Sequence, residues 1–183
     1  GSGSFADVYA GSYRFHGQSA PLAVAFKVFR GGQAVTPEAL TVIKRELRHG
    51  SQLHHENLIR IFGVIDLPQR GLALALELAH RGSLRSVLDS RAEHPHLPWQ
   101  LRVKWLVGVA SGMAELHGML PHPIIHRDLK AANVLLSGTD LSVAVAKVSD
   151  FGLSLALEAS RLSLSGGGGA GTLAFKAPEV FAG

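Results

Sequence analysis

The segment 124–136, IIHRDLKAANVLL, constrains the fold of this chain more than any other part of its sequence. It brings a carboxylate (Asp128), an ammonium (Lys130) and an amide (Asn133) within six residues of one another. Two isoleucines precede these groups and Val-Leu-Leu follows them, and such residues are typical of a hydrophobic core. We therefore expect both ends of the segment to be anchored in the core and its polar side chains to be held at one place.

The composition indicates a soluble, folded protein. Of the 183 residues, 46% are hydrophobic and 17% are charged, which is typical of a globular chain with a sizeable core. The longest apolar stretch, 71–79, is too short to cross a bilayer and contains Glu77, so we expect no membrane segment. The absence of cysteine excludes disulfides, thiolate catalysis and Cys-bound zinc. The net charge of +4 is spread along the chain, which argues against a nucleic-acid partner.

The N-terminal part reads as strands interrupted by one helix. Alternating residues predict strands at 7–15 and 22–29, and within the second of these Ala25 and Lys27 share a face. Thr-Pro-Glu at 36–38 is a helix start, so a helix is expected over about 37–49, with Glu46 at the edge of its buried stripe. Two further strands are predicted, at 58–65 and 72–78.

The C-terminal part reads as mainly helical. We place a boundary between two lobes at 77–82, where the pattern of the last strand is broken. A short helix is expected at 83–91 and a long one at 99–118, which has apolar residues along one face. Short strands are expected at 134–136 and 143–149, and the glycine-rich run 162–172 is expected to be a loop.

The glycines at the start of the chain are weak evidence when taken alone. Gly1 and Gly3 are followed by Ala6 where a third glycine would complete a phosphate-binding pattern, and an ordinary turn explains the pair equally well. A dinucleotide-binding fold needs a strand before the glycines and a helix after them, whereas here a strand follows. No GxxxxGK[ST] sequence is present. Both of these nucleotide sites are therefore disfavoured.

The order of the motifs is more informative than any one of them. A glycine-rich turn, Lys27 on a strand, Glu46 on a helix, HRDLKAAN, DFG at 150–152 and APE at 177–179 follow one another along the chain. In this the chain resembles the eukaryotic protein kinases. GSFADVYAG, RGSL and GTLAFKAPEV further resemble the tyrosine-kinase-like group of serine/threonine kinases.

The resemblance implies an α+β, bilobal fold. Its N-lobe (1–79) would be an antiparallel sheet with one regulatory helix, and its C-lobe (80–183) would be partial and mainly helical. The family has a strand before the glycine-rich loop and several helices after APE, so we expect the sequence to be truncated at both ends.

The resemblance also implies where ATP would bind. Backbone N–H groups of Gly1, Ser2 and Gly3 would approach the phosphates, and Lys27 would hold the α- and β-phosphates while Glu46 orients its ammonium. Val8 and Ala25 would form an apolar roof over adenine. Glu77 and Ala79 would offer hinge backbone groups to its edge.

The catalytic roles follow from the same resemblance. Asn133 and Asp150 would bind Mg²⁺, which prefers oxygen ligands. Asp128 would accept the hydrogen bond of the substrate hydroxyl, and Lys130 would place a cation between the attacking oxygen and the γ-phosphate. His126 is interpreted as a structural residue that packs against Phe151 rather than as a base.

These roles imply a serine/threonine protein kinase that uses ATP and Mg²⁺, acts on proteins in signalling and works in the cytoplasm, in a parent that is free or membrane-anchored. Two interpretations are open for Ser160, Ser163 and Ser165. The protein or another kinase would phosphorylate them, and Arg127 would bind the phosphate. Alternatively, these serines only keep the loop solvated. An ATP-binding scaffold related to pseudokinases is the alternative function, which Ala6 and Gly50 make conceivable.

Overall fold

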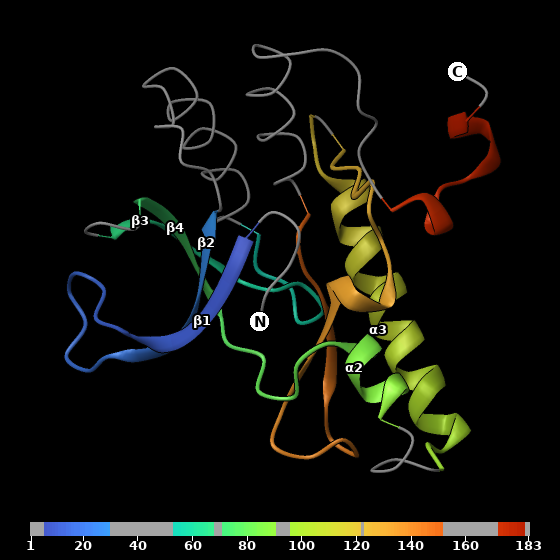
Figure 1. Cartoon of the computed structure of the whole chain (residues 1–183), viewed down its shortest axis with the longest axis horizontal. Helices are drawn as coiled ribbons and strands as arrows, with labels where there is room; N and C mark the ends of the chain where they lie inside the picture. The colour runs from blue at the N-terminus through green and yellow to red at the C-terminus, as the bar shows by residue number, and fades with distance from the viewer. Residues whose placement is uncertain are drawn as a thin grey trace.

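The structure, a computed structural model, describes residues 6–29, 53–67, 71–90, 96–121, 123–151 and 172–181. The N-terminal part of these residues forms one four-stranded antiparallel sheet with the order β1-β2-β4-β3. Its strands are β1 (Ala6–Tyr13), β2 (Leu22–Phe29), β3 (Ile61–Leu67) and β4 (Gly71–Glu77). Figure 1 shows this sheet on the left of the molecule.

The strand register places the expected nucleotide-binding side chains on one face of the sheet. Val8 lies opposite Lys27, and in the next pair of strands Ala25 lies opposite Leu76. Residues directly opposite one another in a sheet have side chains on the same face, and so have residues two apart on one strand. Val8, Ala25 and Lys27 therefore share a face, as the alternation in β2 predicted for the last two.

Aromatic side chains lie on the opposite face of the same sheet. The ring of Phe26 contacts that of Tyr13 with centroids 6.3 Å apart, and Tyr13 in turn contacts Phe15 at 4.8 Å. Phe15 also contacts Phe62 at 5.2 Å. These rings tie β1 and β2 to β3, so the sheet is packed on this face by contacts of its own.

The C-terminal part contains two helices and a two-stranded sheet. The helices are α2 (Leu84–Asp89) and α3 (Trp99–Gly118), and the strands are β5 (Val134–Ser137) and β6 (Val145–Val148). Ser83 caps α2 by accepting a hydrogen bond from the N–H of Ser86 at 3.1 Å. Three short 3-10 turns complete the description: η1 (Ala131–Asn133), η2 (Leu173–Phe175) and η3 (Pro178–Phe181).

One apolar core joins the two parts. Leu74 and Leu76 of β4 belong to the same buried cluster as Leu116 of α3 and Phe151. The segment before β3 connects them, because Leu58 forms a parallel bridge with Val148 of β6. In Figure 1, α2 and α3 lie on the opposite side of this connection from the sheet. The site described below is built where the two parts meet.

Most of the predicted elements are present with shifted ends. The strand predicted at 58–65 begins only at Ile61, because the N–H of Ile59 donates to Val148 O at 2.9 Å and this pairing uses the residues before it. The strand predicted at 143–149 begins at Val145, because a turn closes when the N–H of Ala144 donates to Leu141 O at 3.3 Å. The first strand ends at Tyr13 rather than at residue 15.

Several predictions concern residues outside the described ranges. The helix at 37–49 with Glu46 and Gly50, the loop residues 162–171 and the three candidate phosphorylation sites are among them. The antiparallel N-lobe sheet and the helical C-lobe agree with the predicted bilobal class. The boundary between residues 79 and 80 stays a prediction. Within the described ranges, no helix has the length and apolarity needed to cross a membrane.

Candidate active site

His126 is buried, with an exposed fraction of 2%, and both of its ring nitrogens are engaged. Its Nε2 lies 2.9 Å from Ser149 O, and its Nδ1 accepts a hydrogen bond from the N–H of Asp128 at 3.3 Å. The backbones of Ser149 and Asp128 therefore fix the orientation of the ring. The structural role predicted for His126 is thus supported, although its bonds are to the backbones of Ser149 and Asp128 rather than to Phe151.

Asp128 is the centre of the polar cluster. One carboxylate oxygen, Oδ2, lies 2.8 Å from Lys130 Nζ and accepts a hydrogen bond from Asn133 Nδ2 at 3.0 Å. The other, Oδ1, accepts from the N–H and the hydroxyl of Thr172 at 2.9 and 2.8 Å. Burial by itself raises the pKa of Asp128, but the bonds from Lys130 and Thr172 outweigh it and hold the pKa below its ordinary value. Asp128 is therefore ionised at neutral pH.

Lys130 contacts both Asp128 and Thr172, which is another partner of Asp128. Its ammonium donates to the hydroxyl oxygen of Thr172 as well as pairing with Asp128. The hydroxyl of Thr172 thus donates to the carboxylate and accepts from the ammonium. The carboxylate of Asp128 and the ammonium of Lys130 have the chemistry to bind the hydroxyl of another molecule, and the carboxylate can accept its proton.

Asn133 has a fixed amide orientation. Its Nδ2 donates to Asp128 O at 2.8 Å and to Asp128 Oδ2 at 3.0 Å. Because the amide group is planar, two bonds from the nitrogen direct the amide oxygen of Asn133 away from Asp128. That oxygen is a hard ligand of the kind Mg²⁺ prefers.

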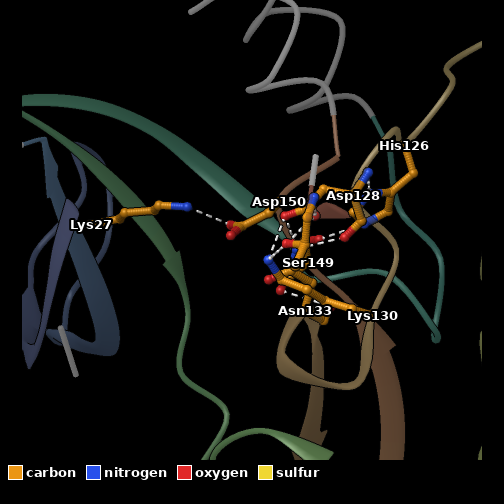
Figure 2. Close-up of polar contacts among 8 residues, drawn as sticks. Lys27, His126, Asp128, Lys130, Asn133, Ser149 and Asp150 are labelled. Carbon is orange, nitrogen blue, oxygen red and sulfur yellow. Dashed lines mark hydrogen bonds and ion pairs between the residues drawn. The ribbon is translucent and has the colours of Figure 1, made fainter. Parts of the chain in front are cut away.

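Lys27 reaches from the N-lobe sheet to Asp150 in the C-lobe. Its Nζ lies 2.7 Å from Asp150 Oδ1, and the two side chains have exposed fractions of 15% and 33%. Figure 2 shows Lys27 extending from its strand toward Asp150, with the cluster around Asp128 beyond it. Asp150 has a φ of 66°, in the left-handed region that non-glycine residues rarely adopt. Strained backbone of this kind is concentrated at functional sites.

The expected hinge residues differ in what their backbones already bind. The N–H of Glu77 donates to Arg60 O at 2.9 Å, and the carbonyl of Ala79 accepts from Gly82 at 3.3 Å. The carboxylate of Glu77 pairs with Lys147 Nζ at 3.0 Å and accepts a hydrogen bond from the N–H of Arg60 at 3.3 Å. Two of the expected hinge groups, the N–H of Glu77 and the carbonyl of Ala79, are thus engaged in the protein's own hydrogen bonds.

The structure brings together Lys27, Asp128, Lys130, Asn133 and Asp150. Val8 and Ala25 lie on the sheet face of Lys27, with Val8 36% exposed and Ala25 buried. Gly1, Ser2, Gly3 and Glu46 lie outside the described residues. Over the part of the chain that the structure describes, no three His, Asp or Glu side chains form a metal site. Asp150 and Asn133 nevertheless fit Mg²⁺, which is held by few protein oxygens together with substrate phosphates.

Two features of the site were not predicted from the sequence. Ser149 is buried beside Asp150 and bonds both His126 and Asn133, and its position directly before DFG was the only signal. The ion pair between Glu77 and Lys147 joins residues 70 apart, so no local pattern marks it.

Comparison with known proteins places this geometry in context. The family described as protein tyrosine and serine/threonine kinase matches residues 1–183. A probable serine/threonine-protein kinase of Dictyostelium discoideum, roco7, is 37% identical over 155 residues, 85% of this chain and 6% of that protein. Mitogen-activated protein kinase kinase kinase 10 of Mus musculus is 36% identical over 98% of this chain, and kinase kinase kinase 11 of Rattus norvegicus 35% over 98%. The chain spans 18% and 20% of those two proteins.

Proposed function

This chain belongs to the protein tyrosine and serine/threonine kinase family, and from that premise we propose that it forms the catalytic core of a serine/threonine protein kinase. The relatives bear out the resemblance of its motifs to serine/threonine kinases of the tyrosine-kinase-like group. The reaction we propose transfers the γ-phosphate of ATP to Ser or Thr hydroxyls of proteins.

One observation supports the proposal above the others. Lys27 and Asp150 are 123 residues apart in sequence, yet their charged groups are 2.7 Å apart. An amine from the sheet and a carboxylate from the C-lobe thus face one space, where an anionic phosphate and a divalent cation would each find a group of opposite charge. Phosphoryl transfer depends mainly on such positioning and charge neutralisation.

The nucleotide would lie between the sheet and the C-lobe. Lys27 would hold the α- and β-phosphates, oriented by Glu46, with the backbone of Gly1, Ser2 and Gly3 around them. Val8 and Ala25 would cover adenine from the sheet face they share with Lys27, and Glu77 and Ala79 would supply backbone hydrogen bonds at its edge. Asp150 and Asn133 would hold Mg²⁺, which neutralises phosphate charge when it is bound.

The protein hydroxyl would be received by Asp128 and Lys130. The carboxylate of Asp128 would accept its hydrogen bond and, late in the transfer, its proton. The ammonium of Lys130 would contact the attacking oxygen and the transferred phosphoryl group. The way these two groups bind the hydroxyl of Thr172 supports this assignment, because it shows that both can contact one hydroxyl at once.

Regulation and location belong to the same proposal. Phosphorylation of Ser160, Ser163 or Ser165 would introduce a phosphate that the guanidinium of Arg127 would bind. We place the kinase on the cytoplasmic side of the cell, where ATP and Mg²⁺ are available.

The test is transfer of labelled γ-phosphate to a generic protein substrate by the full-length protein. We expect transfer to fall to background in Asp150→Asn and to persist in Asp140→Asn. Asp140 is the matched control, because its carboxylate also accepts hydrogen bonds but lies on a C-lobe turn with Ser142. Equal transfer by the protein and by Asp150→Asn would leave the scaffold function, in which the site acts through binding alone.

A further inference from the structure

Ser149 is a buried polar residue to which the proposed reaction assigns no role. It lies between the end of β6 and Asp150, with an exposed fraction of 5%. A buried hydroxyl must be hydrogen bonded or it costs free energy, so its partners report what it holds in place. Both neighbouring candidates for Mg²⁺, Asp150 and Asn133, are within reach of Ser149.

Ser149 binds the carbonyl of Asn133 twice. Its N–H donates to Asn133 O at 2.9 Å, and its hydroxyl donates to the same oxygen at 2.9 Å. In the opposite direction, the carbonyl of Ser149 accepts the hydrogen bond from His126 Nε2 at 2.9 Å. Ser149 therefore joins the turn η1 and the HRD segment to the residue that precedes Asp150. Figure 2 shows Ser149 between Asn133 and Asp150.

The two bonds to Asn133 do different work. The N–H bond depends on the backbone alone and persists whatever side chain is present. The hydroxyl bond is added by the serine, and it restrains the carbonyl of the same residue whose amide oxygen is directed away from Asp128. Asp150 follows Ser149 directly in the chain, so a shift of Ser149 moves one candidate ligand relative to the other.

From these contacts we propose that Ser149 is a positioning residue that holds Asn133 and Asp150 in register for one divalent cation. The inference rests on the proposed function, since the cation is the one that would accompany the ATP phosphates. Groups that orient metal ligands through hydrogen bonds typically affect metal affinity about 10- to 100-fold. A single neutral hydroxyl bond, backed by the N–H bond, belongs at the lower end of this range.

Among the bonds of the described residues, the ammonium of Lys27 makes none to Ser149 itself. This ammonium lies on the N-lobe sheet and contacts Asp150 Oδ1, not Ser149 or Asn133. Loss of the Ser149 hydroxyl should therefore weaken the part of nucleotide binding that depends on Mg²⁺ and spare the part that does not. A merely structural serine would change the two parts equally.

The experiment measures binding of the ATP analogue AMP-PNP to the full-length protein by calorimetry, with and without Mg²⁺. The gain in affinity that Mg²⁺ produces is compared among variants. We expect Ser149→Ala and Ser149→Cys to lower this gain about tenfold, because Ala lacks the donor and the Cys thiol is a weak one. Ser149→Thr, which keeps a hydroxyl, is expected to restore most of the gain. Cys is close to Ser in size, so at least one variant without the hydroxyl should fold.

The matched control is Ser90→Ala. The Ser90 hydroxyl also donates to a backbone carbonyl, Ser86 O, at 2.9 Å, but this bond lies at the surface, at the end of α2. The gain should be unchanged in this variant. An unchanged gain in folded Ser149→Ala or Ser149→Cys, or equal losses with and without Mg²⁺, would overturn the role of Ser149 while the proposed kinase function stands. No Mg²⁺-dependent binding by the unaltered protein would overturn both.

Discussion

The two sides of the site are built in different ways. In the C-lobe, the single residue Asp128 makes bonds to Lys130, Asn133 and Thr172, and the first two of these lie within five residues of it in the sequence. On the N-lobe side, the described residues give the ammonium of Lys27 one ion pair, to Asp150. The catalytic loop is therefore held by several mutually supporting bonds, whereas the described residues place Lys27 by strand register and by its long-range contact with Asp150.

This difference separates two kinds of positioning. A connected cluster of hydrogen bonds keeps its geometry when one partner moves, because each group has another bond. A single ion pair depends on how the two lobes are arranged. We therefore expect substitutions in the catalytic loop to affect the chemical step and substitutions at Lys27 to affect nucleotide binding and the relation between the lobes.

Asp128→Asn is expected to have the largest effect. Asparagine is nearly isosteric but cannot accept a proton, and general acid–base groups contribute about 10²- to 10⁴-fold to rates. The value of kcat for phosphoryl transfer should fall by that factor, while KM for ATP changes little. Steady-state kinetics of the full-length protein measure both, with Asp140→Asn as the control. A loss confined to KM would mean that Asp128 is not at the reacting centre.

Lys27→Met should have the next largest effect, and this effect should be on nucleotide affinity rather than on kcat. Removing a charged hydrogen-bond partner costs about 1.5–3 kcal/mol, which corresponds to roughly a 10- to 150-fold loss. We expect the dissociation constant for AMP-PNP to rise by this factor while the protein stays folded. Lys104→Met is the control, because Lys104 contacts only a surface carbonyl, Ser142 O, among the bonds described. Unchanged nucleotide affinity in Lys27→Met would show that Lys27 does not contact the nucleotide.

The same Gly→Ala change can be compared in the two lobes. At Gly112 in α3 an added Cβ would lie 2.6 Å from Asn57 O, which is backbone and cannot easily move. Overpacking of this kind should lower the free energy of unfolding by about 1–3 kcal/mol. At Gly11 the Cβ would lie 2.9 Å from the ring of Phe26, the end of a side chain that can turn.

We expect Gly11→Ala to cost less than about 1 kcal/mol. Chemical denaturation of both variants measures the difference, and Gly118→Ala, where nothing lies within 4 Å, is the control. A cost at Gly11 equal to that at Gly112 would show that the aromatic face of the sheet is as rigid as the packing of α3.

The smallest effect concerns pH. The pKa of Asp128 is lower in the folded protein than its ordinary value of about 3.9, so its ionisation stabilises the fold above that pH. This contribution is lost as the pH falls through the lowered pKa. The stability difference between the protein and Asp128→Asn should thus be constant near neutral pH and shrink below about pH 4. Denaturation curves at several pH values measure it, and a difference that grows in acid would contradict the assigned bonds.

Local patterns in the sequence were enough to locate much of this fold. The alternation of β2 put Ala25 and Lys27 on one face, and α3 forms over the predicted range 99–118, with Trp105 and Leu116 buried. The close spacing of Asp128, Lys130 and Asn133 predicted a polar cluster because residues so near in sequence cannot be far apart. Strand ends were less accurate, since pairing with Val148 replaced the expected start of β3.

The sequence by itself determined which elements form and which side chains the catalytic loop presents, because strand and helix periods and short spacings act over a few residues. Only the tertiary structure decided which distant groups meet: Lys27 with Asp150, Thr172 with Asp128 across 44 residues, and Ser149 with Asn133 across 16. Such contacts depend on how the sheet, α3 and β6 pack around their shared core, and no local pattern encodes that arrangement.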